Sequence, residues 1–312
     1  MARRMLVLNS PHHRLNAMTG RCMPFNKTPI KHLLIFVLIS LSSPHSTIAF
    51  GETITLNANT QLQGKFVQGG LIRGKTLANS QISLDGKSIR PTPDGQFAFG
   101  FGRDAAKTST IEITPASGIM STHTLKVQPR DYKLQRVNGV PQKTVTPPKS
   151  VLGRIKKEGR LVKTARKTDS NATDFLSTFQ WPLIGPITGV YGSQRIYNGT
   201  PKRPHFGLDI AAPVGTVVRA PTDVTVTLAH QNMYYSGGTL IMDHGYGISS
   251  TFIHLDEVLV KVGDKIKKGD IVAKVGSKGR STGPHLDWRI NWFGVRLDPA
   301  LIMPDLPTTQ KK

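Results

Sequence analysis

The sequence predicts a mostly β protein, with a small N-terminal β module, a basic helical linker and an all-β C-terminal domain. Three observations lead to this prediction. Runs rich in Val, Ile and Thr alternate with Gly, Pro and Asp-Gly turns along residues 52–128 and 181–304, as strands joined by tight turns do. Between them, residues 129–180 place apolar side chains at helical spacing among many Lys and Arg. The chain has 312 residues, enough for at least one sizeable core.

The charge and the N-terminus indicate where the protein acts. The formal net charge of +22 favours an anionic partner or surface. Lys31 precedes the apolar run 33–41, and small residues follow as far as Ala49, which is the layout of a secretory signal peptide. We therefore expect residues 1–49 to be a signal peptide, with Met23 as an alternative start. The protein is then exported, to the periplasm or cell envelope.

Export changes the interpretation of the charge. Nucleic acid is the default partner of a strongly basic chain, but an exported protein does not meet it, so we expect no nucleic-acid partner. Two interpretations stay open: attraction to an anionic envelope surface, or surface solubility alone. The sequence leaves the oligomeric state undetermined.

Residues 52–128 predict a small β-sandwich of immunoglobulin-like or carboxypeptidase-regulatory type. Turns such as Asp85-Gly86 and Asp94-Gly95 separate short alternating segments. The module contains no polar cluster that indicates chemistry, so a spacer role is favoured over binding of carbohydrate or a partner. The expected strands are 53–56, 70–74, 81–84, 96–99, 109–113 and 123–127.

Residues 129–180 predict a basic linker that contains a helix and packs on the C-terminal domain. The apolar spacing begins near Ser150, although Gly153 and Gly159 weaken it, and residues 168–171 interrupt it before a second short helix. The alternative, a nucleic-acid-binding arm, conflicts with export. A further hypothesis, from position and charge, is that residues 150–178 lie across the active-site groove and inhibit it.

The C-terminal domain, residues 181–304, predicts an all-β barrel or sandwich, followed by a tail over residues 305–312. Its expected strands are short and rich in Val, Ile and Thr, with Gly and Pro between them. They are 215–220, 224–228, 238–243, 248–254, 258–262 and 271–275.

Five polar residues in short apolar segments of this domain suit a divalent-metal hydrolase, which needs a few ligands and further groups to move protons. They are His205, Asp209, His254, His285 and Asp287. Residues at i and i+2 of a strand share a face, so His285 and Asp287 can address one site. An extended strand would separate His205 from Asp209 by about 13 Å, so a bend at the intervening glycine is expected.

The ordered motifs Pro204–Asp209, His254 and Val260–Asp287 resemble peptidase family M23, the lysostaphin- or LytM-type zinc endopeptidases that cut peptide crosslinks in peptidoglycan. The resemblance covers about residues 181–300 and implies a LytM-like domain related to barrel-sandwich hybrids. It implies one divalent metal ion, most often Zn²⁺, and hydrolysis of a peptidoglycan peptide by a metal-activated water.

Residue by residue, the resemblance makes His205 and Asp209 metal ligands and places the third ligand at position 287. It makes His254 and His285 the catalytic histidines. The family usually has a histidine where this chain has Asp287. Aspartate is an acceptable zinc ligand, but two carboxylates neutralise a dication, so weaker zinc binding or another divalent ion is expected.

Two other interpretations follow from this departure and from position. The family contains degenerate members, so the alternative function is a non-catalytic envelope protein that binds peptidoglycan and regulates other wall hydrolases. Tyr191, Arg195 and Asn198 precede the first ligand motif and are predicted to bind substrate, the alternative being ordinary loop packing. Residues 260–270 also resemble the hairpins of lipoyl and biotinyl carriers, which we interpret as shared fold because a carrier does not need the three histidines.

Overall fold

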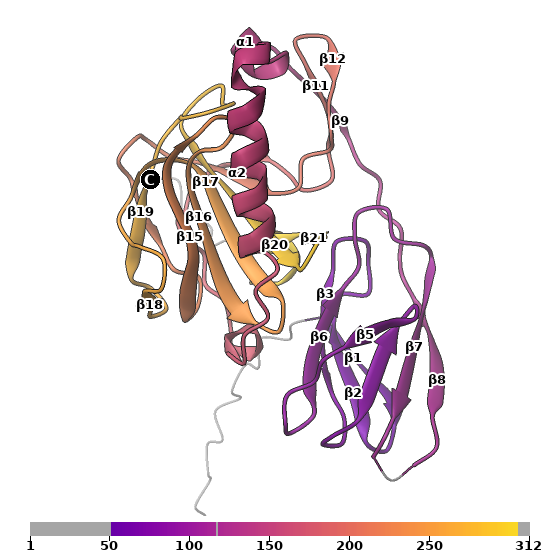
Figure 1. The fold of residues 1–312 in the computed structure, drawn as a ribbon. Helices are drawn as coiled ribbons and strands as arrows, with labels where there is room; N and C mark the ends of the chain where they lie inside the picture. Colours follow the sequence, from indigo (N-terminus) through magenta and orange to yellow (C-terminus); the bar gives the residue numbers. More distant parts are fainter. Residues whose placement is uncertain (1–50, 117, 305–312) are drawn as a thin grey trace, which may run out of the picture. The chain divides into compact units, whose positions relative to one another are not determined.

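The computed structural model describes residues 51–116 and 118–304 (Figure 1). Strands predominate in this part of the chain, which confirms the predicted mostly β fold. The predicted signal peptide, the alternative start at Met23 and the tail at 305–312 lie outside the described residues. Within the described ranges, no helix is both long and apolar enough to cross a membrane.

The N-terminal module consists of two four-stranded antiparallel sheets whose buried side chains share one core. All six predicted strands are present, together with β2 and β5, which have too few apolar residues to be recognised. Asp85 and Gly86 both have positive φ and join β4 to β5 in a tight hairpin. One sheet consists of β1(Glu52–Asn57), β2(Thr60–Gly64), β3(Leu71–Lys75) and β6(Gln96–Gly100). The other consists of β5(Lys87–Ile89), β4(Gln81–Leu84), β7(Thr108–Thr114) and β8(Ser121–Lys126).

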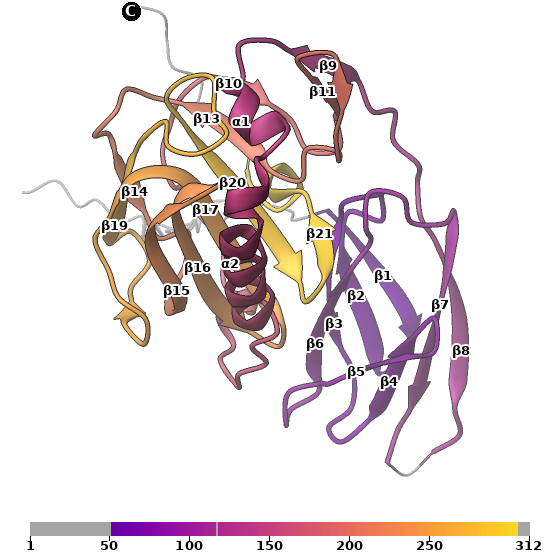
Figure 2. The ribbon, with the colours of Figure 1, turned by 45° about the horizontal axis from the view of Figure 1, so that its top comes forward.

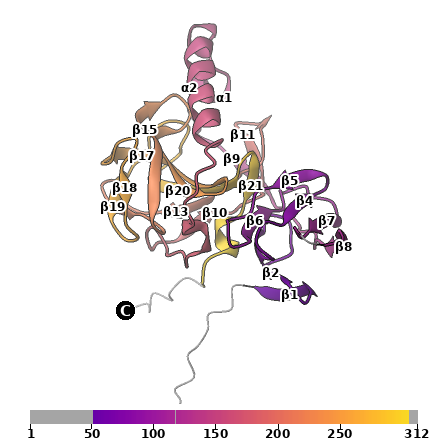
Figure 3. The same cartoon turned by 60° about the horizontal axis from the view of Figure 1, so that its bottom comes forward.

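The linker holds the predicted basic helix, and it also adds a strand that was not predicted. Helix α2 (Leu152–Ala165) packs on β15 (Val224–Met233) through Ala165, Leu228 and Met233 (Figures 1 and 3). The expected second helix is only a 3₁₀ turn, Asp174–Leu176. Strand β9 (Leu134–Val137) pairs in parallel with β11 in the small sheet β12-β11-β9. The remaining elements are α1(Gln142–Val145), a 3₁₀ turn at Lys149–Val151, β11(Gln194–Tyr197) and β12(Thr200–Pro201).

The C-terminal domain is built on a ten-stranded sheet of order β10-β13-β20-β17-β16-β15-β18, with β14, β19 and β21 among its strands (Figure 2). The strand predicted at 258–262 is wrong, because β17 ends at Val258 and the exposed Leu259 and Val262 lie in the following loop. The strands not yet given are β10(Ile187–Gly189), β13(Leu208–Ala211), β14(Val217–Arg219), β16(Gly237–Gly245), β17(Ile248–Val258), β18(Lys265–Ile266), β19(Ile271–Val275), β20(His285–Trp292) and β21(Val295–Leu297).

The three strands β13, β20 and β17 have one face in the core. Leu208, Trp288 and Phe252 lie opposite one another across these strands and are almost completely buried. The rings of Phe252 and Trp288 meet edge to face at 6.4 Å between centroids, and Trp181 packs on Trp288 at 6.2 Å. Because successive side chains alternate between faces, Asp209, Asp287 and Ile253 share the opposite face.

Replacing Phe252 by alanine tests whether this aromatic packing stabilises the sheet. Deleting a fully buried phenylalanine removes apolar contacts and leaves a cavity, so we expect the free energy of unfolding to fall by about 3–5 kcal/mol in denaturant titration. The exposed Leu259 is the control, and Leu259→Ala should change it by less than about 0.5 kcal/mol. Equal effects of the two substitutions would contradict the described core.

Candidate metal centre

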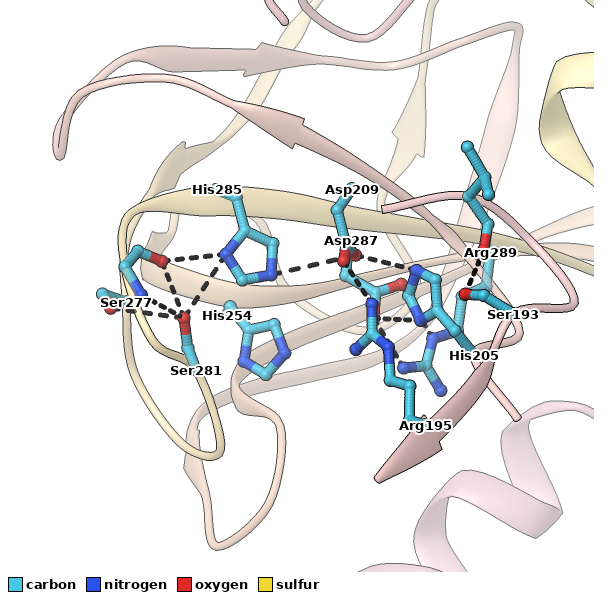
Figure 4. Close-up of polar contacts among 12 residues, drawn as sticks. Ser193, Arg195, His205, Asp209, His254, Ser277, Ser281, His285, Asp287 and Arg289 are labelled. Carbon is cyan, nitrogen blue, oxygen red and sulfur yellow. Dashed lines mark hydrogen bonds and ion pairs between the residues drawn. The ribbon is translucent and has the colours of Figure 1, made fainter. Parts of the chain in front are cut away.

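The register of the sheet brings two carboxylates face to face. Asp209 on β13 lies directly opposite Asp287 on β20, and both side chains are buried (Figure 4). His285, two residues before Asp287, shares their face. Like charges directly opposite each other destabilise a sheet, and buried charges need partners. The pair therefore requires cations close by.

Two arginines supply part of that positive charge. Arg195 on β11 donates from Nη2 to Oδ2 of Asp209 at 2.6 Å. Arg289 donates to both oxygens of Asp287, from Nε at 2.9 Å and from Nη2 at 2.6 Å. Burial raises the pKa of Asp209, but His205 and Arg195 lower it more, to about 2. Burial also raises the pKa of Asp287, yet Arg289 outweighs it and holds that pKa well below its usual range. Both carboxylates are therefore ionised at neutral pH.

His205 lies between the two carboxylates. Its Nε2 is 3.0 Å from Oδ1 of Asp209, and its Nδ1 is 3.9 Å from Oδ2 of Asp287. One donor atom from each of His205, Asp209 and Asp287 lies within 4.8 Å of the other two. Apart from this contact with each other, Nε2 of His205 and Oδ1 of Asp209 are buried without a hydrogen-bond partner among the described residues.

These observations fit a metal ion. Imidazole nitrogen and carboxylate oxygen are zinc ligands, and an ion would satisfy both unpartnered atoms. Arg195 hydrogen-bonds to Oδ2 of Asp209 and not to Oδ1, and a carboxylate that accepts hydrogen bonds from an outer group still has lone pairs for a metal. The three side chains predicted as ligands are therefore brought together in an arrangement that can hold one ion.

The two other predicted site histidines lie at the edge of this cluster. Nε2 of His285 is 3.8 Å from Oδ1 of Asp209, and the His254 and His285 ring centroids are 4.9 Å apart. Nδ1 of His285 lies 2.8 Å from the Gly283 carbonyl oxygen, and Nδ1 of His254 lies 2.8 Å from that of Lys278. A carbonyl only accepts, so each Nδ1 carries a proton and each Nε2 is left unprotonated when the ring is neutral.

A β-bulge positions His254. Between the pairs Gly238–Leu255 and Leu240–Phe252, β17 has one residue more than β16, and His254 takes φ 65° there. Bulges of this kind redirect a side chain, and left-handed backbone in a residue other than glycine is found often at functional sites. Burial lowers the pKa of His254 to about 4, so its ring is neutral near pH 7.

Two glycines leave room for the carboxylates. A Cβ at Gly189 would lie 2.1 Å from Oδ2 of Asp209, and one at Gly207 would lie 2.1 Å from Oδ1 of Asp287. Both distances are far below van der Waals contact, so any larger residue would displace the charged pair. The bend expected at Gly207 does not by itself predict this second role, which is to give space to Asp287.

Of the residues predicted to bind substrate, only Arg195 lies at the cluster. Tyr191 is 1% exposed and donates from its hydroxyl to the Arg296 carbonyl at 2.8 Å, so it packs inside the domain instead of lining a groove. Asn198 hydrogen-bonds to the backbone of Val140 through both its oxygen and its nitrogen. Loop packing, the alternative interpretation, describes both residues in this structure.

The linker borders the site, but through a different segment from the one predicted. A small pocket of about 110 Å³ beside Asp209 and His285 is also lined by Gln135, Val137 and Val140. No residue of 150–178 lines this pocket, because α2 packs on β15 instead. In this structure residues 150–178 do not line the pocket beside the cluster, and the hypothesis that they inhibit the site stays a prediction. No sequence signal marked residues 134–140, since β9 pairs with a strand far away in the chain.

Comparison with known proteins gives the site a family context. The model for "Peptidase family M23" matches residues 203–299. The peptidoglycan DD-endopeptidase ShyA of Vibrio cholerae is 33% identical over 126 residues, 39% of this chain and 29% of that protein. The DD-carboxypeptidase/endopeptidase Mpg of Neisseria meningitidis is 36% identical over 112 residues, 35% of this chain and 26% of that protein. The chain thus aligns with less than a third of the length of these curated relatives.

A solved structure agrees over a larger part of the chain. The crystal structure of a putative peptidase M23 from Pseudomonas aeruginosa is 25% identical, with a TM-score of 0.59, and the match covers 77% of this chain and 96% of that one. The matched family segment contains His205, Asp209, His254, His285 and Asp287. The chain therefore contains a peptidase family M23 domain, and the cluster of histidines and aspartates lies within it.

Proposed function

We propose that this protein is an exported metalloendopeptidase that hydrolyses peptide crosslinks of peptidoglycan. The observation that carries the proposal is the buried group of His205, Asp209 and Asp287, with two unpartnered donor atoms, inside an M23 domain. The substrate class is supported by similarity to relatives named as peptidoglycan DD-endopeptidases. Export to the periplasm or envelope rests on the signal-peptide pattern of residues 1–49.

The proposed ligands are His205, Asp209 and Asp287, with Zn²⁺ as the ion that best suits this mixture of nitrogen and oxygen donors. When bound, such an ion supplies Lewis-acid chemistry, polarising a carbonyl and making a water more acidic. The chain's own residues then move protons. Nε2 of His285 faces the cluster and can take a proton from the attacking water, then return it to the departing amine. His254, kept neutral by burial, offers a second acceptor nitrogen that orients the water.

The two arginines alter the electrostatics expected from the sequence. We expected two carboxylates to neutralise a dication, but Arg195 and Arg289 already offset both negative charges. The Asp287–Arg289 pair carries no net charge, as a neutral imidazole at the same position would. Two carboxylates without arginine partners would make a water beside the ion less acidic. With the arginines present, we expect this loss of acidity to be smaller.

The alternative function is a non-catalytic M23-like protein that binds peptidoglycan and regulates other wall hydrolases. The observation that favours it is again Asp287, which stands where the family usually has histidine and which uses both oxygens on Arg289. Metal binding separates the two functions, because a regulator does not need an ion.

Metal binding can be measured directly by calorimetric titration of the metal-free full chain with Zn²⁺. We expect about one ion per chain. Replacing a group that only hydrogen-bonds to a metal ligand weakens metal binding roughly 10–100-fold, and we expect Asp209→Asn, which alters a ligand itself, to weaken Zn²⁺ binding by more than that. The control is Asp223→Asn, which alters an exposed ion pair with Lys267 and should leave the affinity unchanged. Unfolding midpoints without metal check that each variant folds. An absence of Zn²⁺ binding by the unaltered protein would favour the regulatory alternative.

Catalysis can be tested with His285→Ala on purified sacculi supplemented with Zn²⁺, with products identified by mass. General acid–base catalysis contributes about 10²–10⁴-fold, so we expect the rate to fall at least 100-fold. His230→Ala is the matched control, since that ring only accepts a bond from the Asn232 amide at 3.1 Å. If digestion by the His285 variant proceeded at the original rate, the assignment of His285 would be wrong.

A further inference from the structure

A second pocket, next to the metal cluster, is lined by an unusual concentration of arginine. It has a volume of about 420 Å³, and its walls include Tyr197, His205 and Phe206. No aspartate or glutamate is among the residues that line it. We call it the arginine pocket and define it by its five guanidinium-bearing residues, Arg195, Arg203, Arg280, Arg289 and Arg296.

The five arginines come from separate parts of the domain. Arg195 lies on β11, Arg289 on β20 and Arg296 on β21, while Arg203 and Arg280 lie in the loops before β13 and before β20. A set of like charges converging from five segments repels itself, because the pocket walls replace much of the water that screens exposed charges. Such a convergence is typical of a site that binds an anion.

Within the described part of the chain, two of these arginines are ion-paired. Arg195 is paired with Asp209, and Arg289 with Asp287. Among the described residues, no carboxylate lies within ion-pair distance of the other three. Arg280 lies over the rings of Tyr197 and Tyr235 at 5.1 and 4.8 Å, and Nη1 of Arg296 donates to Asn291 Oδ1 at 3.2 Å. The pocket thus holds about three positive charges that this part of the chain does not neutralise.

The surroundings make these charges costly without a ligand. Burial and the neighbouring Arg289 lower the pKa of Arg296 to about 10, and burial lowers the pKa of Arg280. Arg166, which interacts electrostatically with Arg289 and Arg296, hydrogen-bonds to Thr251, but its buried Nε has no partner among the described residues. A bound anion would relieve this repulsion. The guanidinium group, with its planar fork of donors, suits carboxylate and phosphate oxygens.

The arginine pocket adjoins the metal cluster, and this position indicates which anion it binds. Arg195, Tyr197 and Arg280 line both the arginine pocket and the pocket that holds Asp209 and His285, so the two pockets share a wall. His205 belongs to the metal cluster and also lines the arginine pocket. A peptide chain that lies across the cluster therefore has its adjacent residue within reach of these arginines.

We propose that the arginine pocket binds a carboxylate of the substrate peptide, next to the bond that is cut, so that the enzyme prefers an acidic peptide over its amidated form. The proposal rests on the proposed function for the peptide nature of the ligand. It assigns Arg203, Arg280 and Arg296 to substrate binding, a role that the sequence analysis gave to none of them.

The test is a binding measurement, which does not depend on hydrolysis. The full chain is titrated calorimetrically with three ligands. They are acetyl-D-Ala-D-Ala with a free C-terminal carboxylate, the same peptide with a C-terminal amide, and inorganic phosphate. Charge-assisted hydrogen bonds to the carboxylate should make the acid bind about tenfold or more tightly than the amide. Arg280→Gln and Arg203→Gln should each reduce that preference severalfold, and Arg280→Lys should restore part of it.

Arg160→Gln is the matched control, because it removes one positive charge from the exposed face of α2, outside both pockets. Arg203 is itself exposed, so its variant remains informative if Arg280→Gln is unstable. Equal binding of acid and amide, or an equal loss in the Arg160 variant, would overturn the proposal. Phosphate binding that the acid peptide does not displace would also overturn it and assign the pocket to a phosphate ligand.

These outcomes are separable from the proposed function. A carboxylate preference in a protein that does not digest sacculi would support the arginine pocket and contradict catalysis. Digestion of sacculi by a protein that binds acid and amide equally would support catalysis and contradict the role of the arginine pocket.

Discussion

Two aspartates that face each other across β13 and β20 are the constraint on which the rest of the C-terminal domain depends. Asp209 and Asp287 are buried, ionised and directly opposed, an arrangement that a sheet tolerates only with compensating cations. Arg195 and Arg289 provide that compensation within the chain, and Gly189 and Gly207 leave the space it occupies. A metal ion between His205 and the two carboxylates would complete it.

The same three strands connect this charged face to the core. Trp288 and Leu208 neighbour the two aspartates in sequence but point to the other side, where Phe252 packs against the tryptophan. A slip of one residue in register would exchange the faces, burying carboxylates in the core and exposing the tryptophan. Aromatic packing therefore fixes the geometry of the site, and the arginines make that geometry electrostatically acceptable.

Much of this could be predicted from the sequence, because strand alternation and short motifs are local. The strands of the N-terminal module, helix α2 and the grouping of His205, Asp209 and Asp287 follow from patterns of a few residues. The roles of Arg195, Arg280 and Arg296 depend on strands and loops far apart in the chain, which no local pattern brings together. Arg289 was within reach of prediction, since it lies two residues after Asp287 on the same strand face. The course of residues 134–140 beside the site came from a parallel pairing that the sequence does not mark.

The most direct measurement is a crystal structure of the Zn²⁺-soaked protein with anomalous diffraction at the zinc edge. The described geometry predicts one strong anomalous peak about 2.0–2.2 Å from a ring nitrogen of His205 and from an oxygen of each of Asp209 and Asp287. Arg289 should remain hydrogen-bonded to Asp287 behind the ion. A peak held by other side chains, or no peak with Arg289 closing both oxygens of Asp287, would contradict the metal centre.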